Sequence, residues 1–274
     1  MIKIDFTGKT VLITGGTKGI GLASALEFAR AGAKTYLTYK WGSADTGTLY
    51  SRFESEGLIK PELIEADASR EEDTKSLLEG IRKKEAKIDV FVSNVGFSAR
   101  VLSLSEYKKR TLYKTLDYST WPLIDYTKTI KEIFGRFPDS VVGISSDGPD
   151  HFYTGYDFVA ASKALLEFFG KYLAIHLGNE GSRVNIIRFG MVRTDSFNEI
   201  FGKNFFAFLK KEGFNEDILV TPEECGKVIF AVSSGYLDAL NGQVVTVDKG
   251  LPYRDNLMMR YFESQKSIDK KSSS

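Results

Sequence analysis

Short apolar runs rich in β-branched residues alternate along the chain with segments of helical periodicity. Strands that alternate with helices pair in parallel, because each helix returns the chain to the same end of the sheet. The pattern therefore predicts an α/β fold, a single-domain, doubly wound parallel sheet of Rossmann type with helices on both faces. The expected strands are 11–14, 35–39, 62–65, 90–92, 141–144, 184–187 and 244–247. The first expected helix carries one apolar stripe, Leu22, Ala25, Leu26 and Ala29, and ends at Gly32.

The patterned elements predict one domain over residues 1–264. Residues 265–274 are polar or charged apart from Ile268, and we expect this tail to be disordered. A stretch rich in aromatic residues lies at 195–219, between two strand patterns. Two interpretations stay open, helices that cover an apolar pocket and ordinary core helix. Its apolar residues are Phe197, Ile200, Phe201, Phe205, Phe206, Phe208 and Leu209.

The charge balance argues against several kinds of partner. Lys plus Arg number 37 against 36 Asp plus Glu, and a net charge of +1 provides no field to hold nucleic acid or an anionic membrane. No apolar run reaches the length of a membrane span. Cys225 is the single cysteine and there are two histidines, which leaves little for a disulfide or a metal site. With no apolar signal-peptide block near residue 1, we expect a cytoplasmic protein without a bound metal.

A glycine-rich turn follows the first expected strand and leads into the first helix. Glycines let a backbone approach a pyrophosphate closely, and a helix N-terminus adds N–H groups and a positive dipole. The order of strand, turn and helix therefore predicts a dinucleotide-phosphate site. Its candidate residues are Gly15, Thr17, Lys18, Gly19, Ile20 and Gly21.

The spacing of Thr14, Gly15, Gly19 and Gly21 resembles the Thr-Gly-x-x-x-Gly-x-Gly motif of the short-chain dehydrogenase/reductase family. Further family elements match in order at 67–68, 93–96, 145–146, 190–194 and 241–248, so the resemblance covers about residues 6–250. It implies an oxidoreductase that uses a nicotinamide cofactor. The further cofactor-binding residues that it implies are Asp67, Ala68, Asn94, Gly96, Lys163, Gly190, Val192 and Thr194.

The end of the second strand bears on the choice of cofactor. An NAD-specific site usually places a carboxylate there to bind the ribose 2′-hydroxyl. This chain has Tyr39, Lys40 and Trp41 instead, and both Lys18 and Lys40 are candidates to meet a 2′-phosphate. We therefore expect NADPH rather than NADH.

The catalytic positions depart from the common family pattern of Tyr-x-x-x-Lys. Lys163 stands where the family has its lysine, but the tyrosine position is Val159 and the nearest tyrosine is Tyr156. Seven residues make almost two helical turns, so Tyr156 and Lys163 would share a helix face with the tyrosine displaced by about 5 Å along the axis. In an α,β-unsaturated thioester the oxygen lies two carbons from the carbon that receives hydride, whereas in a ketone it lies on that carbon. A displaced tyrosine suits the thioester.

The Tyr-x6-Lys spacing resembles the enoyl-acyl-carrier-protein reductase branch of the family. Ser119, at a position usually occupied by asparagine, and residues 95–97 agree with that branch, while the glycine turn keeps the ordinary spacing of its NADPH-preferring variant. The resemblance implies reduction of the C=C bond of an acyl thioester, carried on acyl carrier protein or coenzyme A, in fatty-acid or polyketide synthesis.

The resemblance also implies roles for the catalytic residues. Lys163 would hold the nicotinamide ribose and help lower the pKa of Tyr156, Tyr156 would meet the thioester oxygen, and Ser146 would be a secondary site. Two alternatives stay open. One is a carbonyl (β-ketoacyl) reductase or alcohol dehydrogenase that uses Tyr156 or Tyr153, and the other is a non-catalytic NADPH sensor.

The family commonly forms homodimers or homotetramers through the helices that follow strands four and five, and the resemblance implies such a homo-oligomer here. Aromatic residues on those helices would suit an interface, and they would equally suit a core. They are Trp121, Phe168, Phe169 and Tyr172.

Overall fold

The structure is a computed structural model that describes residues 4–40, 45–194, 197 and 204–254. Within those residues, seven parallel strands form one sheet in the order β3-β2-β1-β4-β5-β6-β7. This is the doubly wound sheet that the sequence pattern predicts, and each expected strand is present. The strands are β1 (Thr10–Ile13), β2 (Lys34–Tyr39), β3 (Glu62–Glu65), β4 (Val90–Ser93), β5 (Ser140–Ser146), β6 (Arg183–Phe189) and β7 (Val244–Val247).

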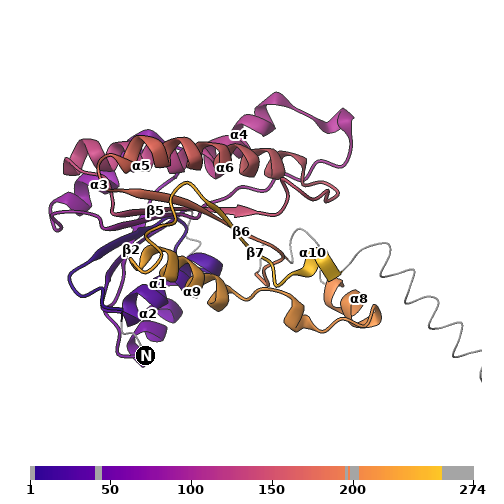
Figure 1. Cartoon of the computed structure of the whole chain (residues 1–274), viewed down its shortest axis with the longest axis horizontal. Coiled ribbons are helices and arrows are strands. Elements are labelled where there is room, and N and C mark those ends of the chain that lie inside the picture. The colour runs from indigo at the N-terminus through magenta and orange to yellow at the C-terminus, as the bar shows by residue number, and fades with distance from the viewer. Residues whose placement is uncertain (1–3, 41–44, 195–196, 198–203, 255–274) are drawn as a thin grey trace, which may run out of the picture.

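Helices cover both faces of the sheet, as Figure 1 shows. One face carries α3 (Glu71–Arg82), α4 (Lys109–Ser119), α5 (Trp121–Phe134) and α6 (Asp157–Gly178). The other carries α1 (Gly19–Arg30), α2 (Thr46–Ser55) and α9 (Pro222–Ser233). Two short helices, α8 (Phe205–Lys211) and α10 (Leu251–Arg254), lie beyond the sheet. None of the described helices is long and apolar enough to cross a lipid bilayer.

The core is divided into two layers by the alternation of side chains along each strand. In β1, Val11 and Ile13 pack toward α1 and α9, whereas Leu12 packs toward α3, α5 and α6. All three side chains are fully buried. Because successive strand residues point to opposite faces, a single central strand anchors both helical layers.

The first helix follows its predicted stripe. Ala25, Leu26 and Ala29 are buried, and Gly32, with φ of +90°, takes the chain out of the helix. On the same face, α9 begins with a capping box in which the Thr221 hydroxyl accepts from the N–H of Glu224. Cys225 is buried in this layer.

Two of the described aromatic residues of the 195–219 stretch pack against each other. The Phe197 and Phe205 rings are 5.0 Å apart, edge to face, and Leu209 forms a small separate cluster with Ile218 and Leu219. This arrangement favours local packing over the lining of a pocket. Ile200, Phe201, the Phe206 side chain and the predicted tail 265–274 lie outside the described residues.

Close contact between α1 and α9 depends on Gly226. A Cβ added there would lie 2.7 Å from the backbone carbon of Ala23. We expect Gly226→Ala to lower the free energy of unfolding by about 1–3 kcal/mol, because two helix backbones must separate.

Gly80→Ala is the control, since Gly80 lies in α3 with nothing within 4 Å of an added Cβ. That change should stabilise the protein by up to about 1 kcal/mol. Urea denaturation compares the two, and equal effects would contradict the close packing.

Candidate active site

The glycine turn lies at the point where the order of the strands reverses, between β1 and β4. Gly15 has φ of +61°, and the Asn94 side-chain amide donates to the carbonyl oxygens of Thr14 and Gly15, each at 3.0 Å. Gly21 lies directly beneath the turn, where a Cβ would come 2.4 Å from the Gly15 oxygen. The turn is therefore closed on one side by α1 and on the other by the end of β4.

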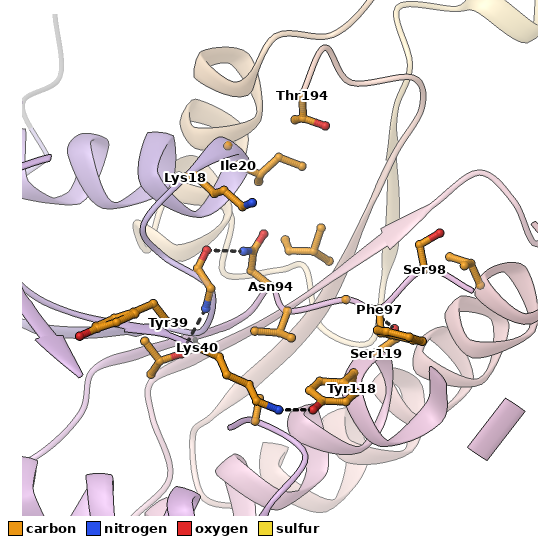
Figure 2. A pocket seen from close by; sticks show the side chains of 18 of the residues that line it. Lys18, Ile20, Tyr39, Lys40, Asn94, Phe97, Ser98, Tyr118, Ser119 and Thr194 are labelled. Carbon is orange, nitrogen blue, oxygen red and sulfur yellow. Dashed lines mark hydrogen bonds between the residues drawn. The ribbon is translucent and has the colours of Figure 1, made fainter. Parts of the chain in front are cut away.

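A cavity of about 720 Å³ opens above this turn. It extends from the start of α1 to the end of β4 and the segment before α6. Figure 2 shows Lys18 and Ile20 on one side of it and Phe97, Ser98 and Ser119 on another. The cavity lies at the carboxyl ends of the strands, where ligands bind in open α/β sheets.

One corner of the cavity is built around Lys40. Its ammonium group donates to the Asp67 carboxylate and to the Tyr118 hydroxyl, and Tyr118 also donates to Asp67 at 3.1 Å (Figure 2 shows the Lys40–Tyr118 contact). Burial raises the pKa of Asp67, but hydrogen bonds from Lys40 and Ser69 outweigh it and leave that pKa below its ordinary value. Lys40 and Asp67 thus form a charged pair at the end of β2, held by a residue of α4.

Lys163 lies behind Gly96, at the wall of the cavity. A Cβ built on Gly96 would lie 3.8 Å from both the Lys163 Nζ and the Ser119 Oγ. The Lys163 ammonium donates to the Ile144 carbonyl at 2.7 Å, and the side chain is buried. Burial lowers the pKa of Lys163 to about 8, although Glu167 acts in the opposite direction. One Lys163 donor is therefore engaged by the protein, which leaves others for a ligand.

Tyr156 is the residue immediately before α6, and it lines the cavity. Its hydroxyl donates to the Ser146 Oγ at 3.2 Å. A Cβ on Gly148 would come 2.7 Å from the Tyr156 ring, so the absence of a side chain at Gly148 leaves room for the ring. Val159, in the first turn of α6, lines the same cavity.

The pKa of Tyr156 is shifted in the direction opposite to the one that the resemblance implies. Burial raises the pKa of the Tyr156 hydroxyl, the Ser146 hydrogen bond lowers it, and Asp147 raises it further, with a net increase. Lys163 is not among the groups that shift it. The expected lowering of this pKa by Lys163 is therefore absent, because the ammonium is directed at the Ile144 carbonyl. Tyr156 is a neutral hydrogen-bond donor.

Tyr153 is arranged differently from Tyr156. Its hydroxyl donates to the buried Asp147 carboxylate at 2.7 Å, and its ring packs edge to face on Tyr156 at 5.9 Å. Tyr153 is not among the described residues that line the cavity. Of the two candidate tyrosines, only Tyr156 contacts the space in which a substrate and a cofactor would meet.

Most of the residues singled out from the sequence meet at this cavity. Four further predicted residues do not line the cavity but contact residues that do. They are Gly21 beside Gly15, Asp67 beside Lys40, Ser146 beside Tyr156 and Lys163 beside Gly96. Gly190 packs against Asp248, and Val192 is buried beside Val220, so neither lines the cavity. The lining residues that were predicted are Gly15, Thr17, Lys18, Gly19, Ile20, Lys40, Ala68, Asn94, Gly96, Tyr156 and Thr194.

Several lining residues have no signal in the sequence. Arg100 and Gly155 belong to loops without periodicity, and Tyr118 reaches the cavity only because its helix faces the end of β2. The aromatic stretch shows the opposite case. Phe197, Phe205 and Phe208 are described, yet none of them lines the cavity.

A Rossmann-type sheet with a glycine turn at its reversal point, and a tyrosine and a lysine at one end of the cavity, defines a dinucleotide-binding oxidoreductase. Comparison with known proteins agrees. The family model described as Enoyl-(Acyl carrier protein) reductase matches residues 15–252. The chain belongs to the short-chain dehydrogenase/reductase family, whose fold binds NAD(P)H.

Relatives within the family have different activities. A 7alpha-hydroxysteroid dehydrogenase of Paraclostridium sordellii is 31% identical over 88% of this chain and 91% of its own length. The enoyl-[acyl-carrier-protein] reductase [NADH] FabI of Aquifex aeolicus is 27% identical over 89% and 91%. A short chain dehydrogenase from Burkholderia cenocepacia, solved in complex with NADP, superposes with a TM-score of 0.77 at 24% identity, over 89% of this chain and 98% of that one. These relatives establish the family and the fold, and they leave the substrate open.

The buried position of Lys163 leads to a direct titration experiment. Desolvation penalises the charged ammonium, so Lys163 should lose its proton as the pH rises through about 8, well below its ordinary 10.5. NMR of the protein labelled at the lysine ε-carbons should show one signal with that midpoint. Lys163→Arg identifies the signal by removing it. If every lysine signal titrates near 10.5, the ammonium is solvated and this account of the site is wrong.

Proposed function

We propose that the protein catalyses NADPH-dependent reduction of the C=C bond of an α,β-unsaturated acyl thioester. The observation that carries the proposal is the position of the tyrosine hydroxyl. Tyr156 lines the cavity from the residue before α6, while Val159 occupies the position at which the family's tyrosine usually stands. A donor displaced in this way suits an oxygen that lies two carbons from the carbon receiving hydride.

The cofactor half of the cavity fits a dinucleotide. The glycine turn and the first N–H groups of α1 would hold the pyrophosphate, and Lys18 and Lys40 would meet a 2′-phosphate. Lys163 would hold the nicotinamide ribose, since its ammonium adjoins Gly96. The proposed preference for NADPH over NADH depends on Lys40, which lines the cavity. It would distinguish this chain from the Aquifex relative, whose name specifies NADH.

At the other end of the cavity, Tyr156 would act on the thioester. NADPH, when bound, supplies the hydride that is added at the β-carbon, and a proton from solvent completes the reduction at the α-carbon. The neutral Tyr156 hydroxyl would donate a hydrogen bond to the thioester oxygen as it becomes an enolate, and the raised pKa keeps that donor protonated. Ser146 would orient the hydroxyl through the 3.2 Å contact.

One observation favours a second candidate, a carbonyl reductase of the same family. The Tyr156 and Ser146 hydroxyls are 3.2 Å apart, so both could donate to one ketone oxygen if the substrate lay deeper. The hydroxysteroid dehydrogenase among the relatives is consistent with such chemistry. Turnover of β-ketoacyl thioesters, without turnover of enoyl thioesters, would favour this candidate.

We further propose that the active protein is a homo-oligomer. Trp121, Phe168 and Tyr172, which the sequence left between core and interface, are exposed by 43%, 50% and 56%. Phe168 and Tyr172 lie one turn apart on α6 with their rings 4.7 Å apart. A second copy of the chain on this face would remove these rings from water.

A charge change at Lys40 tests the cofactor assignment. We expect Lys40→Gln to weaken NADPH binding about 10- to 100-fold, the value of one charge-assisted phosphate contact, and to leave NADH binding within about twofold. Lys60→Gln removes the same charge from an exposed site and is the control. Cofactor fluorescence titration measures both affinities. Parallel loss of NADH and NADPH binding would contradict a 2′-phosphate contact.

A pair of matched tyrosine variants tests the donor. Tyr156→Phe should lower kcat/KM for crotonyl thioester by about 100-fold or more, since a preorganised oxyanion donor is lost. Tyr153→Phe should lower it less than about tenfold, because Tyr153 is not among the described residues that line the cavity. NADPH oxidation at 340 nm measures the rates. Equal losses would overturn the assignment, and tight NADPH binding with no turnover in wild type would favour a sensor.

A further inference from the structure

Arg100 lines the same cavity as Tyr156, and no sequence motif assigns it a role. It belongs to the loop that follows β4. In Figure 2 the nearby Ser98 lies away from Lys18 and Lys40, so this loop bounds a different part of the cavity from the two lysines. The question is what an arginine would bind there.

The Arg100 side chain is held in place by its neighbours. The Val101 N–H donates to the Gly155 carbonyl at 3.3 Å, and Val101 is buried. Gly155 has φ of +80°, and a Cβ there would lie 2.7 Å from Cγ of Arg100 and 3.3 Å from its Nε. The arginine stem therefore packs flat against Gly155, the residue immediately before Tyr156. This contact places the Arg100 stem against the backbone next to Tyr156.

The charges around the cavity leave Arg100 available to a ligand. The charged side chains among its described lining residues are Lys18, Lys40 and Arg100, all of them cations. Lys40 is paired with Asp67, and Lys18 precedes α1 at the pyrophosphate end. In the part of the chain that the structure describes, no carboxylate or carbonyl accepts from the Arg100 guanidinium. An exposed cation of this kind attracts an anion from the ligand.

We propose that Arg100 binds a carboxylate of the substrate, located a few bonds from the carbon that is reduced. This inference rests on the proposed function, because it assigns the Tyr156 end of the cavity to the acyl group. The planar guanidinium presents two parallel N–H donors that match a carboxylate. The phosphate of coenzyme A or of acyl carrier protein is a poor match for Arg100, because a long pantetheine arm separates it from the acyl group. Arg100 contacts Gly155, which is next to Tyr156. The preferred substrate is then the monothioester of an unsaturated dicarboxylic acid.

The test compares two N-acetylcysteamine thioesters, crotonyl and glutaconyl, which lack phosphate and differ by a terminal carboxylate. Wild type should prefer glutaconyl thioester by about tenfold or more in kcat/KM, the value of a charge-assisted contact. Arg100→Gln should remove that preference, so that the ratio of the two kcat/KM values falls to about one. Arg110→Gln is the matched control, since Arg110 is exposed on α4 and does not line the cavity.

A binding measurement separates this inference from the proposed reaction. Calorimetry with glutarate and the NADP⁺-loaded protein should give an affinity about tenfold or more higher for wild type and Arg110→Gln than for Arg100→Gln. If that difference holds but no enoyl thioester is consumed, the proposed reaction fails and the carboxylate site stands. If Arg100→Gln changes neither glutarate binding nor the glutaconyl preference, the inference is overturned. If Arg100→Gln lowers turnover of crotonyl-coenzyme A but not of the crotonyl N-acetylcysteamine thioester, the inference is also overturned. Arg100 would then bind a phosphate of the carrier.

Discussion

The placement of β1 between β2 and β4 is the constraint on which the rest of the structure depends. β1 pairs in parallel with both, with Val11 opposite Thr35 on one side and Val90 on the other. The chain leaves β1 toward one face of the sheet and leaves β4 toward the other, so a crevice opens between the two exits. The glycine turn follows β1, and Asn94 follows the neighbouring strand β4. The hydrogen bonds from Asn94 to the turn follow directly from that adjacency.

The same constraint determines where chemistry can occur. β5 lies next to β4, and it delivers Ser146 to the crevice and the Ile144 carbonyl to Lys163. The helix that follows, α6, begins directly after Tyr156 and places Lys163 two turns inside it. The tyrosine is therefore exposed to a ligand while the lysine stays behind the wall. This separation explains why burial, and not the lysine charge, dominates the pKa of Tyr156.

Much of this architecture was predictable from the sequence. The strands follow from apolar runs, and the glycine turn follows from a motif whose physical role is clear. The spacing of Tyr156 and Lys163 predicts one helix face for both, whereas the structure has Tyr156 at the N-cap of α6, lining the cavity, and Lys163 inside the helix, behind Gly96. Each of these signals is local, since it depends on residues within about two helical turns or one strand.

The features that escaped prediction depend on contacts between distant segments. The Lys40–Asp67–Tyr118 cluster joins the ends of two strands to α4, and no local pattern reveals it. Arg100 acquires its position from Gly155, fifty-five residues later in the chain. The aromatic stretch has the composition of a pocket cover, but none of its described aromatic residues lines the cavity, and Phe197 and Phe205 pack against each other.

We propose that Tyr156 makes this family member a reductase of C=C bonds. The most direct test is competition, in which crotonyl and acetoacetyl thioesters are mixed in equal amounts with NADPH that carries deuterium at the transferred position. Mass spectrometry then shows which product receives the label. The account predicts deuterium in the butyryl product, with little in the 3-hydroxybutyryl product. Deuterium mainly in the 3-hydroxybutyryl product would contradict it and identify a carbonyl reductase.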